Sequence, residues 1–455
     1  MKVAFCSSEV FPFAKTGGLA DVSGALPWAL ADEGCEVKVF MPLYKNINPQ
    51  ILDQSFGISK VGNVEVIFVR NDNYFLRDAL YGTPKGDYPD NLERFAFFNN
   101  QVIEIMRKIN FNPNIVHCND WQTAPLIIFL RTKYKDVFKS AKLVLTIHNL
   151  AYQGIFPQDK FSILGISGEY FSIQYLEFYG KINLLKGGIV FADMVNTVSP
   201  TYAKQIQTQE FGCGLEGVLR EKKDRLIGIL NAIDYSVWDP YKDKFIYKNY
   251  SPRNLEDKYI NKNRFQKEFG LAEKKNTLLL GMVSRLAEQK GIDILSKGLE
   301  KILKKHQVVI LGLGEEKYHK ILQDIEKRNK KSFVLFLKFD EELAHKIYAS
   351  CDCFLLPSRF EPCGLSQMIS YRYATVPIVH HTGGLADTVV DYSDKGGGFV
   401  FKNYSEIDLI NTIERAKEVF ERKEEWLKLL KKITKYNFSW QRTAKEYMNM
   451  YRLIL

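Results

Sequence analysis

The sequence predicts an α/β protein made of two doubly wound domains, each with a mostly parallel sheet. Short β-rich runs alternate with helix-compatible segments along the whole chain, as in βαβ units. The runs are continuously apolar, which is typical of parallel strands covered by helices on both faces. In addition, 455 residues exceed what one hydrophobic core usually supports, so two domains are expected.

The first domain is expected to span residues 1–240. We expect helices at Ala124–Lys133 and Leu185–Ala192, and one helix from about Leu19 to Gly34. The strands of its sheet are predicted at Val3–Cys6, Glu36–Met41, Val64–Arg70, Ile115–His117, Leu143–Ile147, Met194–Val198 and Leu226–Leu230.

The second domain is expected to span residues 241–439. Its first part, Tyr241–Lys275, is charged and poor in aliphatic residues, which indicates an inter-domain connection with one short helix. The last stretch, Trp440–Leu455, is predicted to be a helix that is apolar on one face. Strands are predicted at Thr277–Ser284, Val308–Leu313, Phe333–Phe339, Cys353–Pro357, Val376–His380 and Gly398–Phe401.

One hexapeptide occurs twice. TGGLAD stands at Thr16–Asp21 and again at Thr382–Asp387, each time between a β-run and a helix-compatible stretch. Two similar domains that each present a Gly-Gly turn toward a shared cleft would explain the repetition. The second copy makes Gly383 and Gly384 candidates for substrate contact.

Composition narrows the class of protein. The net charge is +10, but the basic residues are interleaved with acidic ones, as in the predicted helix Arg415–Lys435, and form no basic stripe. No nucleic-acid partner is therefore expected. No apolar run is long enough for a membrane span, and the first residues indicate a strand and no signal peptide. Seven scattered cysteines without a CxxC pair indicate a cytoplasmic protein.

Two motifs carry cations beside glycines. Lys15 precedes Gly17 and Gly18 after the first strand, where glycines let a backbone approach an anionic ligand closely. Arg285 and Lys290 follow the first strand of the second domain, and ligands of open α/β sheets bind at the carboxyl ends of strands. A planar guanidinium and a point charge together suit a diphosphate.

Carboxylate and polar side chains follow other strands. Glu361 precedes a helix that begins near Leu365, so it either caps that helix or holds sugar hydroxyls. Asp120 suits sugar hydroxyls, and Trp121 beside it is either a sugar platform or core. His148 either donates a hydrogen bond to a sugar or presents its main-chain carbonyl, and Asn231 is a hydrogen-bonding candidate. The chain contains no D-x-D pair for a metal.

These motifs together resemble the family of bacterial glycogen synthases and plant starch synthases. The matching segments are KTGGLADV at Lys15, HNLAYQG at His148, SRLAEQKG at Ser284, PSRFEPCGLSQM at Pro357 and TGGLADTVVD at Thr382, and their order matches over nearly the whole chain. The resemblance implies a GT-B fold, with two Rossmann-like domains facing across a deep cleft and a terminal helix returning to the first. It also implies a retaining transfer of glucose from ADP-glucose to the non-reducing end of an α-1,4-glucan, without metal or other cofactor.

The resemblance also assigns roles. Lys15 and Gly18 would touch the donor phosphates, Arg285 and Lys290 would hold them, and Glu361 would bind the transferred glucose. His148 would lie near the anomeric carbon. The catalytic group is thus Glu361, His148, Arg285 and Lys290, and the substrate-binding group is Lys15, Gly17, Gly18, Asp21, Asp120, Asn149, Asn231, Phe339 (stacking on adenine), Cys363, Gly364, Leu365, Ser366, Gly383 and Gly384.

This sequence departs from the family pattern at three positions. Ser366 replaces a Thr and keeps the hydroxyl, and Ala232 stands where Gly is usual, which restrains the turn. Ile369 stands where more distant relatives have a second Glu. Three alternatives remain: a GT-B transferase that uses UDP-glucose or forms another linkage, an NAD-dependent oxidoreductase, and a silent glucan-binding protein. The missing GxGxxG fingerprint counts against the oxidoreductase.

Overall fold

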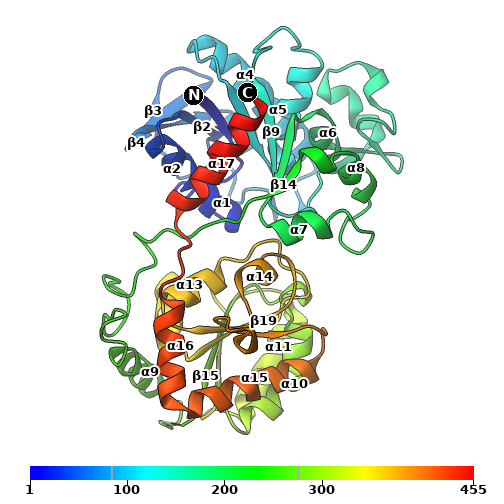
Figure 1. Cartoon of the computed structure of the whole chain (residues 1–455). Helices are drawn as coiled ribbons and strands as arrows, with labels where there is room; N and C mark the ends of the chain where they lie inside the picture. The colour runs from blue at the N-terminus through cyan, green and yellow to red at the C-terminus, as the bar shows by residue number, and fades with distance from the viewer. Residues whose placement is uncertain (84–85, 275) are drawn as a thin grey trace. The chain divides into compact units, whose positions relative to one another are not determined.

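The fold is that of a computed structural model, which describes residues 1–83, 86–274 and 276–455. The chain divides into two compact units (Figure 1). Unit 1 comprises Met1–Asn231 together with Trp440–Leu455, and unit 2 comprises Ala232–Ser439. Among the described residues, no helix is both long and apolar enough to cross a membrane.

Unit 1 is built on a nine-stranded sheet in the order β14-β13-β9-β8-β1-β2-β5-β4-β3. Each predicted strand of this domain lies in it. The strands from β14 to β5 are parallel, whereas β4 and β3 form an antiparallel edge. Their bounds are β1 Lys2–Cys6, β2 Glu36–Pro42, β3 Gln50–Ile51, β4 Phe56–Val61, β5 Val64–Val69, β8 Ile115–Asn119, β9 Lys142–Ile147, β13 Met194–Thr197 and β14 Leu226–Gly228.

Helices and short strands complete unit 1. The α-helices are α1 Gly18–Ser23, α2 Leu26–Asp32, α3 Asp72–Phe75, α4 Asn91–Lys108, α5 Asp120–Arg131, α6 Leu184–Phe191, α7 Pro200–Gln205, α8 Glu216–Glu221 and α17 Trp440–Ile454. Two small sheets contain β6 Gly82–Thr83 with β7 Gly86–Asp87, and β10 Ile155–Pro157, β12 Lys181–Asn183 and β11 Glu177–Phe178. The 3₁₀ helices are η1 Gln158–Leu164, η2 Gly168–Tyr170 and η3 Lys223–Arg225.

The single helix predicted from Leu19 to Gly34 is wrong, because the segment forms α1 and α2. Gly24 ends α1, and its N–H bonds back to the carbonyl of Ala20 at 2.8 Å. A Cβ at Gly24 would lie 2.5 Å from the carbonyl oxygen of Phe11, so only glycine fits this close approach. Pro27 lies in the first turn of α2, where its missing N–H costs nothing.

Unit 2 is built on a six-stranded parallel sheet in the order β17-β16-β15-β18-β19-β20. Its strands are β15 Leu279–Val283, β16 Gln307–Leu311, β17 Phe333–Phe336, β18 Cys353–Leu356, β19 Val376–His380 and β20 Phe399–Phe401. Its helices are α9 Asp257–Glu268, α10 Ile292–Leu303, α11 Glu316–Arg328, α12 Glu341–Ser350, α13 Ser366–Arg372, α14 Gly383–Thr388, α15 Glu406–Glu421 and α16 Lys423–Ile433, with η4 Glu288–Lys290 and η5 Tyr392–Asp394. Each predicted strand of this domain is present.

Residues 241–275 were predicted as an inter-domain connection with one short helix. That helix is present as α9 and packs into unit 2, and residue 275 lies outside the described residues. Lys258 is buried, and its ammonium donates to the carbonyls of Tyr348, Ala349 and Tyr373. Lys262 pairs with Asp352 at 2.6 Å, and both side chains are 4% exposed. Backbone carbonyls accept hydrogen bonds from Lys258, and the Asp352 carboxylate pairs with Lys262. Because both ammonium groups are thus satisfied, the polar helix α9 can be buried against the rest of unit 2.

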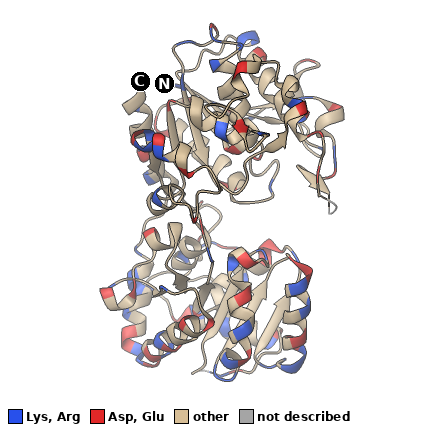
Figure 2. Cartoon of the chain, turned by 90° about the vertical axis from the view of Figure 1, so that its right-hand side faces the viewer, with Lys and Arg blue, Asp and Glu red and all other residues tan. Residues whose placement is uncertain are grey.

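The boundary between the units also differs from the expected one at residue 240. Residues 232–240 belong to unit 2, since Trp238 stacks on His345 with ring centroids 4.0 Å apart. The predicted helix Arg415–Lys435 is interrupted at Arg422, which separates α15 from α16. Both signs of charge alternate along the helices of unit 2 (Figure 2).

The two TGGLAD copies occupy different places in their sheets. The first lies between β1, the first strand of unit 1, and α1. The second lies between β19 and α14, whereas the first strand of unit 2 is β15. The helix begins at Gly18 in the first copy and at Gly383 in the second, one position earlier in the hexapeptide. Each copy therefore lies between a strand and a helix of its own unit, as predicted, although at different strands of the two sheets, and the shared cleft stays a prediction.

Candidate active site

In unit 1 the candidate residues follow three adjacent strands. The sheet order places β9, β8 and β1 side by side. His148 follows β9, Asp120 follows β8, and the loop with Lys15 follows β1. Parallel strands end at one edge of a sheet, which is where open α/β sheets bind ligands.

The loop after β1 holds Lys15, Gly17 and Gly18. The Lys15 ammonium lies 2.6 Å from a carboxylate oxygen of Asp21, and both side chains are about one-third exposed. Apart from the adjacent residues and the backbone of α1 itself, no described atom lies within 4 Å of the position that a Cβ would take at Gly17 or Gly18. The backbone is therefore open on that side, and a ligand can approach it closely.

Asp120 opens α5 in a left-handed conformation, with φ 57°. It is 8% exposed, and its Oδ1 accepts the His148 N–H at 2.7 Å. Burial raises the pKa of Asp120 to about 7, although the backbone N–H groups of His148 and Asn149 favour the ionised form. The Asn149 side chain accepts from the backbone N–H of Ala151.

The His148 ring has one defined tautomer. The amide of Asn119 donates through Nδ2 to the carbonyl of Cys6 at 2.9 Å, so its Oδ1 is oriented as an acceptor. His148 Nε2 lies 2.9 Å from that Oδ1 and therefore carries the proton. Burial lowers the pKa of His148 to about 3, which keeps the imidazole neutral. Nδ1 then bears a lone pair, so this nitrogen can accept a hydrogen bond and cannot donate one.

We expect Asp120→Asn to stabilise the protein at pH 8 by about 2 kcal/mol. A raised carboxyl pKa stabilises the folded state fully below about pH 4, and this contribution is lost as pH rises through about 7. Asparagine carries no charge and keeps an oxygen for the His148 N–H. Urea unfolding at pH 5 and pH 8 measures the gap between the proteins, which widens toward pH 8.

Asp53→Asn is the control of opposite sign. Hydrogen bonds from Lys108 and Ser55 hold the pKa of Asp53 below its usual value despite partial burial, so neutralising this side chain is expected to destabilise the protein at pH 8. An Asp120→Asn protein that is no more stable than wild type at pH 8 would contradict the assignment.

In unit 2 three adjacent strands also bring candidates together. Lys290 follows β15, Glu361 follows β18, and Gly384 follows β19, and these strands are neighbours in the sheet. The Lys290 ammonium lies 2.5 Å from Glu361 Oε2, which also accepts the Ser358 hydroxyl at 3.0 Å. Glu361 is 6% exposed, so the pair lies in a largely dry setting. In such a setting the electrostatic interaction of Lys290 or Glu361 with a bound group would be stronger than in water.

The backbone around Glu361 is closely packed. The Gly384 N–H donates to the Glu361 carbonyl at 3.0 Å, and a Cβ at Gly384 would lie 2.1 Å from the carbonyl oxygen of Cys363. Gly364 is left-handed, with φ 75°. The helix that was predicted near Leu365 is confirmed, since Leu365 is the N-cap residue of α13 and Ser366 is its first residue.

Arg285 donates to the side chain of Gln289 at 3.2 Å, and the Gln289 amide donates to the carbonyl of Phe360, next to Glu361. Phe339 and Asn231 lie elsewhere in their units. Phe339 follows β17, two strands from β15, and is 79% exposed. Asn231 ends unit 1 and is 7% exposed, and within the described residues its Oδ1 has no hydrogen-bond partner. The roles of all the site residues remain predictions.

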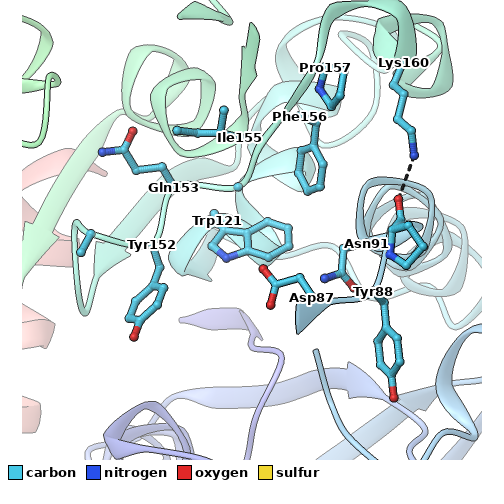
Figure 3. A pocket seen from close by; sticks show the side chains of 13 residues that line it. Asp87, Tyr88, Asn91, Trp121, Tyr152, Gln153, Ile155, Phe156, Pro157 and Lys160 are labelled. Carbon is cyan, nitrogen blue, oxygen red and sulfur yellow. Dashed lines mark hydrogen bonds between the residues drawn. The ribbon is translucent and has the colours of Figure 1, made fainter. Parts of the chain in front are cut away.

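Unit 1 contains a pocket of about 580 Å³ beside Trp121 (Figure 3). The indole is mostly buried: it contacts the rings of Phe95 and Phe156, and a Cβ at Gly154 would lie 2.5 Å from it. Trp121 is thus a core residue that also forms part of the pocket wall. The remaining lining comes from Asp87, Tyr88, Asn91, Lys160 and the segment 151–157.

Two features were missed from the sequence. One is this pocket, whose wall comes from segments that are distant in sequence. The other is Glu9, which is 3% exposed and contacts the loop of Lys15. A carboxylate three residues after a buried strand was the available signal, similar to the position of Asp120 after its own strand.

Comparison with known proteins defines the class first. Residues 2–221 match the starch synthase catalytic domain family, and residues 261–436 match glycosyl transferases group 1. The sucrose-phosphate synthase of Thermosynechococcus elongatus, at 16% identity and a TM-score of 0.63, shares the fold, covering 100% of this chain and 98% of that one. The protein is a glycosyltransferase of GT-B fold.

Whole-chain relatives narrow this class. The glycogen synthases of Geotalea uraniireducens and Thermotoga maritima are 44% and 42% identical over 100% of this chain and 99% of theirs. The catalytic domain of starch synthase IV from Arabidopsis thaliana, solved with ADP and acarbose, superposes with a TM-score of 0.89 at 32% identity, covering 100% of this chain and 99% of that one. The chain belongs to the glycogen and starch synthase family.

Proposed function

We propose that this enzyme transfers glucose from ADP-glucose to the non-reducing end of an α-1,4-glucan, with retention and without a metal, and so elongates glycogen. The observation that carries the proposal is the 44% identity to a glycogen synthase over the full length of both chains. The likeness to a starch synthase solved with ADP and acarbose supports a nucleotide-sugar donor and a glucan acceptor. The seven cysteines, six of them buried, form no disulfide among the described residues, which is compatible with the cytoplasm as the compartment of the protein.

The donor chemistry is assigned to the strand ends of unit 2. Arg285 and Lys290 would neutralise the diphosphate as negative charge grows on the leaving group. Glu361 would hold the transferred glucose, with Cys363–Ser366 at the diphosphate and Phe339 at the adenine. The 2.5 Å contact between Lys290 and Glu361 supports these assignments, because it places the two side chains next to each other. Glu361 would then bind the glucose while Lys290 binds the adjoining phosphate.

Residues of unit 1 would act on the phosphates and the reacting sugar. Lys15 and Gly18 would contact the donor phosphates, supported by Gly17 and Asp21. His148 would lie near the anomeric carbon, where its carbonyl meets developing positive charge and its Nδ1 accepts a hydroxyl. Asp120, Asn149 and Asn231 would hold sugar hydroxyls, and the unpartnered Oδ1 of Asn231 favours such a contact.

For the reaction itself we propose front-face displacement. The bond between glucose and the diphosphate breaks first, leaving an oxocarbenium-like sugar. The acceptor hydroxyl then attacks from the same face and gives its proton to the departing phosphate oxygen. In this scheme the protein contributes position and charge stabilisation and forms no covalent bond to the sugar.

The pocket beside Trp121 is assigned to the glucan. Its wall combines aromatic rings with the polar groups of Asp87, Asn91 and Lys160, a mixture that suits sugars with apolar faces and hydroxyl edges. Its volume of about 580 Å³ is within the range of small-ligand pockets.

A donor panel tests the proposed function. Purified enzyme is mixed with glycogen and either ADP-glucose or UDP-glucose, and release of each nucleoside diphosphate is measured. We expect ADP release that depends on glycogen and at most slow UDP release. Faster UDP release would overturn the donor assignment, and no release from either sugar nucleotide would overturn the function.

A further inference from the structure

The loop of Lys15 is held by a buried carboxylate that belongs to no predicted motif. Glu9 follows β1 and is 3% exposed. Its Oε2 accepts the backbone N–H of Thr16 at 2.5 Å and that of Gly17 at 3.3 Å. Its Oε1 accepts the Thr16 hydroxyl at 2.6 Å and the Tyr81 hydroxyl at 2.7 Å.

The two carboxylate oxygens of Glu9 meet all four donors. Each of its oxygens accepts two hydrogen bonds, and neither carries a hydrogen. Glutamine at position 9 would turn an NH₂ group toward either two backbone N–H groups or two hydroxyls. The shape of the side chain would remain, but either the NH₂ group would face two backbone N–H groups or both hydroxyls would have to turn from donors into acceptors. Glu9 therefore fixes the backbone at Thr16 and Gly17, directly beside Lys15.

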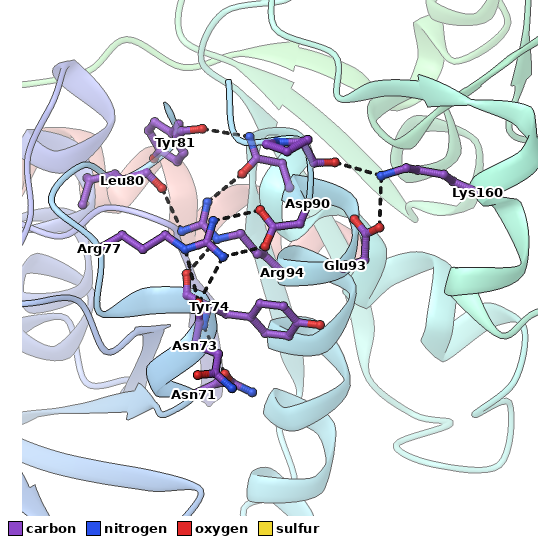
Figure 4. A network of polar contacts seen from close by, with 12 residues as sticks. Asn71, Asn73, Tyr74, Arg77, Leu80, Tyr81, Asp90, Glu93, Arg94 and Lys160 are labelled. Atoms are coloured by element: carbon purple, nitrogen blue, oxygen red, sulfur yellow. Dashed lines mark hydrogen bonds and ion pairs between the residues drawn. The ribbon is translucent and has the colours of Figure 1, made fainter. Parts of the chain in front are cut away.

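The support behind Glu9 is itself anchored (Figure 4). The Tyr81 carbonyl accepts the Asn91 side-chain amide at 2.9 Å. Arg94 is fully buried, and it donates to Asn91 Oδ1 at 2.6 Å and to the Leu80 carbonyl at 3.0 Å. The Tyr81 hydroxyl therefore reaches Glu9 from a segment tied to α4. Because these hydrogen bonds fix the position of Tyr81, Tyr81 in turn fixes the Glu9 carboxylate, and Glu9 holds the Lys15 loop in one arrangement.

We propose that Glu9 is a positioning residue for donor binding: it orients the Lys15–Gly17 loop toward the phosphates of the nucleotide sugar without touching them. This inference rests on the proposed function, in which Lys15 and Gly18 contact those phosphates. A loop released from Glu9 must be ordered again when the nucleotide binds, and this ordering costs free energy. Loss of Glu9 is therefore expected to weaken ADP binding and to raise the KM for the donor. The KM for glycogen stays unchanged.

The test compares Glu9→Gln with wild type by calorimetric titration with ADP and by donor kinetics. We expect the ADP Kd and the donor KM to rise about tenfold or more, with the glycogen KM unaltered. The double variant with Lys15→Ala is expected within about twofold of Lys15→Ala alone, because both changes act on one loop. A purely structural role for Glu9 would instead lower the Tm of Glu9→Gln and leave its ADP Kd at the wild-type value.

Two further variants keep the inference falsifiable. Thr16→Val removes one hydroxyl donor and preserves shape, so a smaller rise in ADP Kd, about threefold, is expected even if Glu9→Gln folds poorly. Asp53→Asn is the matched control: Asp53 also accepts two backbone N–H groups and a hydroxyl in unit 1, so its loss lowers Tm without changing ADP Kd. Wild-type ADP affinity in Glu9→Gln overturns the inference, whereas a wild-type enzyme that does not bind ADP overturns the proposed function.

Discussion

Lys290→Ala is expected to lower kcat at least about a hundredfold, the loss typical of removing one preorganised group that stabilises transition-state charge. The ammonium reaches Glu361 at 2.5 Å from a neighbouring strand end, so it lies where the assigned glucose and diphosphate meet. Its removal also leaves Glu361 buried with the Ser358 hydroxyl and without its cation. Arg285→Ala is expected to lose a similar factor.

The measurement is the initial rate of ADP release from ADP-glucose with saturating glycogen, together with Tm. Lys301→Ala is the matched control, because Lys301 lies on the next helix, α10, with a 63% exposed side chain and one surface ion pair to Glu406. That variant is expected to keep wild-type turnover and stability. Wild-type turnover in Lys290→Ala would contradict a role for the Lys290 ammonium in the mechanism.

Deleting residues 440–455 is expected to prevent unit 1 from folding. The lost helix, α17, packs against α2 and buries eight side chains in unit 1: Trp440, Thr443, Ala444, Tyr447, Met448, Met450, Tyr451 and Ile454. At about 1.5–3 kcal/mol for each large apolar side chain, their loss is comparable with the whole stability of a domain. Soluble expression and a thermal unfolding transition of unit 1 are the readouts.

A chain of buried hydrogen bonds beneath α17 allows the same idea to be tested with a single substitution. Tyr451 donates to Nδ1 of His117 at 2.6 Å, and His117 Nε2 lies 2.5 Å from the Thr146 hydroxyl. Thr146 in turn donates to Asn196 Oδ1, whose Nδ2 donates to the Tyr447 hydroxyl. Burial lowers the pKa of His117 to about 3, which agrees with a ring carrying one proton.

Tyr451→Phe leaves the buried Nδ1 of His117 without a donor. We expect it to cost about 1–3 kcal/mol of unfolding free energy, measured in urea. Leu453→Ala on the exposed side of the same helix is the control, and no more than about 0.5 kcal/mol is expected there. If the truncated chain retained a native unfolding transition for unit 1, α17 would be dispensable.

Strand positions and the strand-end motifs followed from the sequence because both depend on local pattern. An apolar run is sufficient to predict a parallel strand, and chain order then places Asp120, His148 and Glu361 at strand ends. The roles that the family resemblance gives these residues remain predictions, because the contacts alone do not identify the ligand.

Other features could not be predicted because their causes are distant in sequence. The segment around Lys258 was predicted to be a connection with one short helix, and its burial was missed because the carbonyls that accept from Lys258 lie about a hundred residues later. Glu9 was missed because Tyr81, one of its donors, is 72 residues away. The break at Gly24 needed the position of the Phe11 carbonyl, which a helical pattern does not contain.

The membership of α17 in unit 1 sets the order of events during synthesis. A ribosome releases residues 232–439 as one uninterrupted stretch, so unit 2 has its entire sequence before unit 1 does. The first 231 residues leave the ribosome earlier yet lack α17 until residues 440–455 are translated. The amino-terminal half of the polypeptide is thus the later of the two to mature, and a nascent chain stalled anywhere before residue 440 exposes an uncovered apolar surface that chaperones recognise.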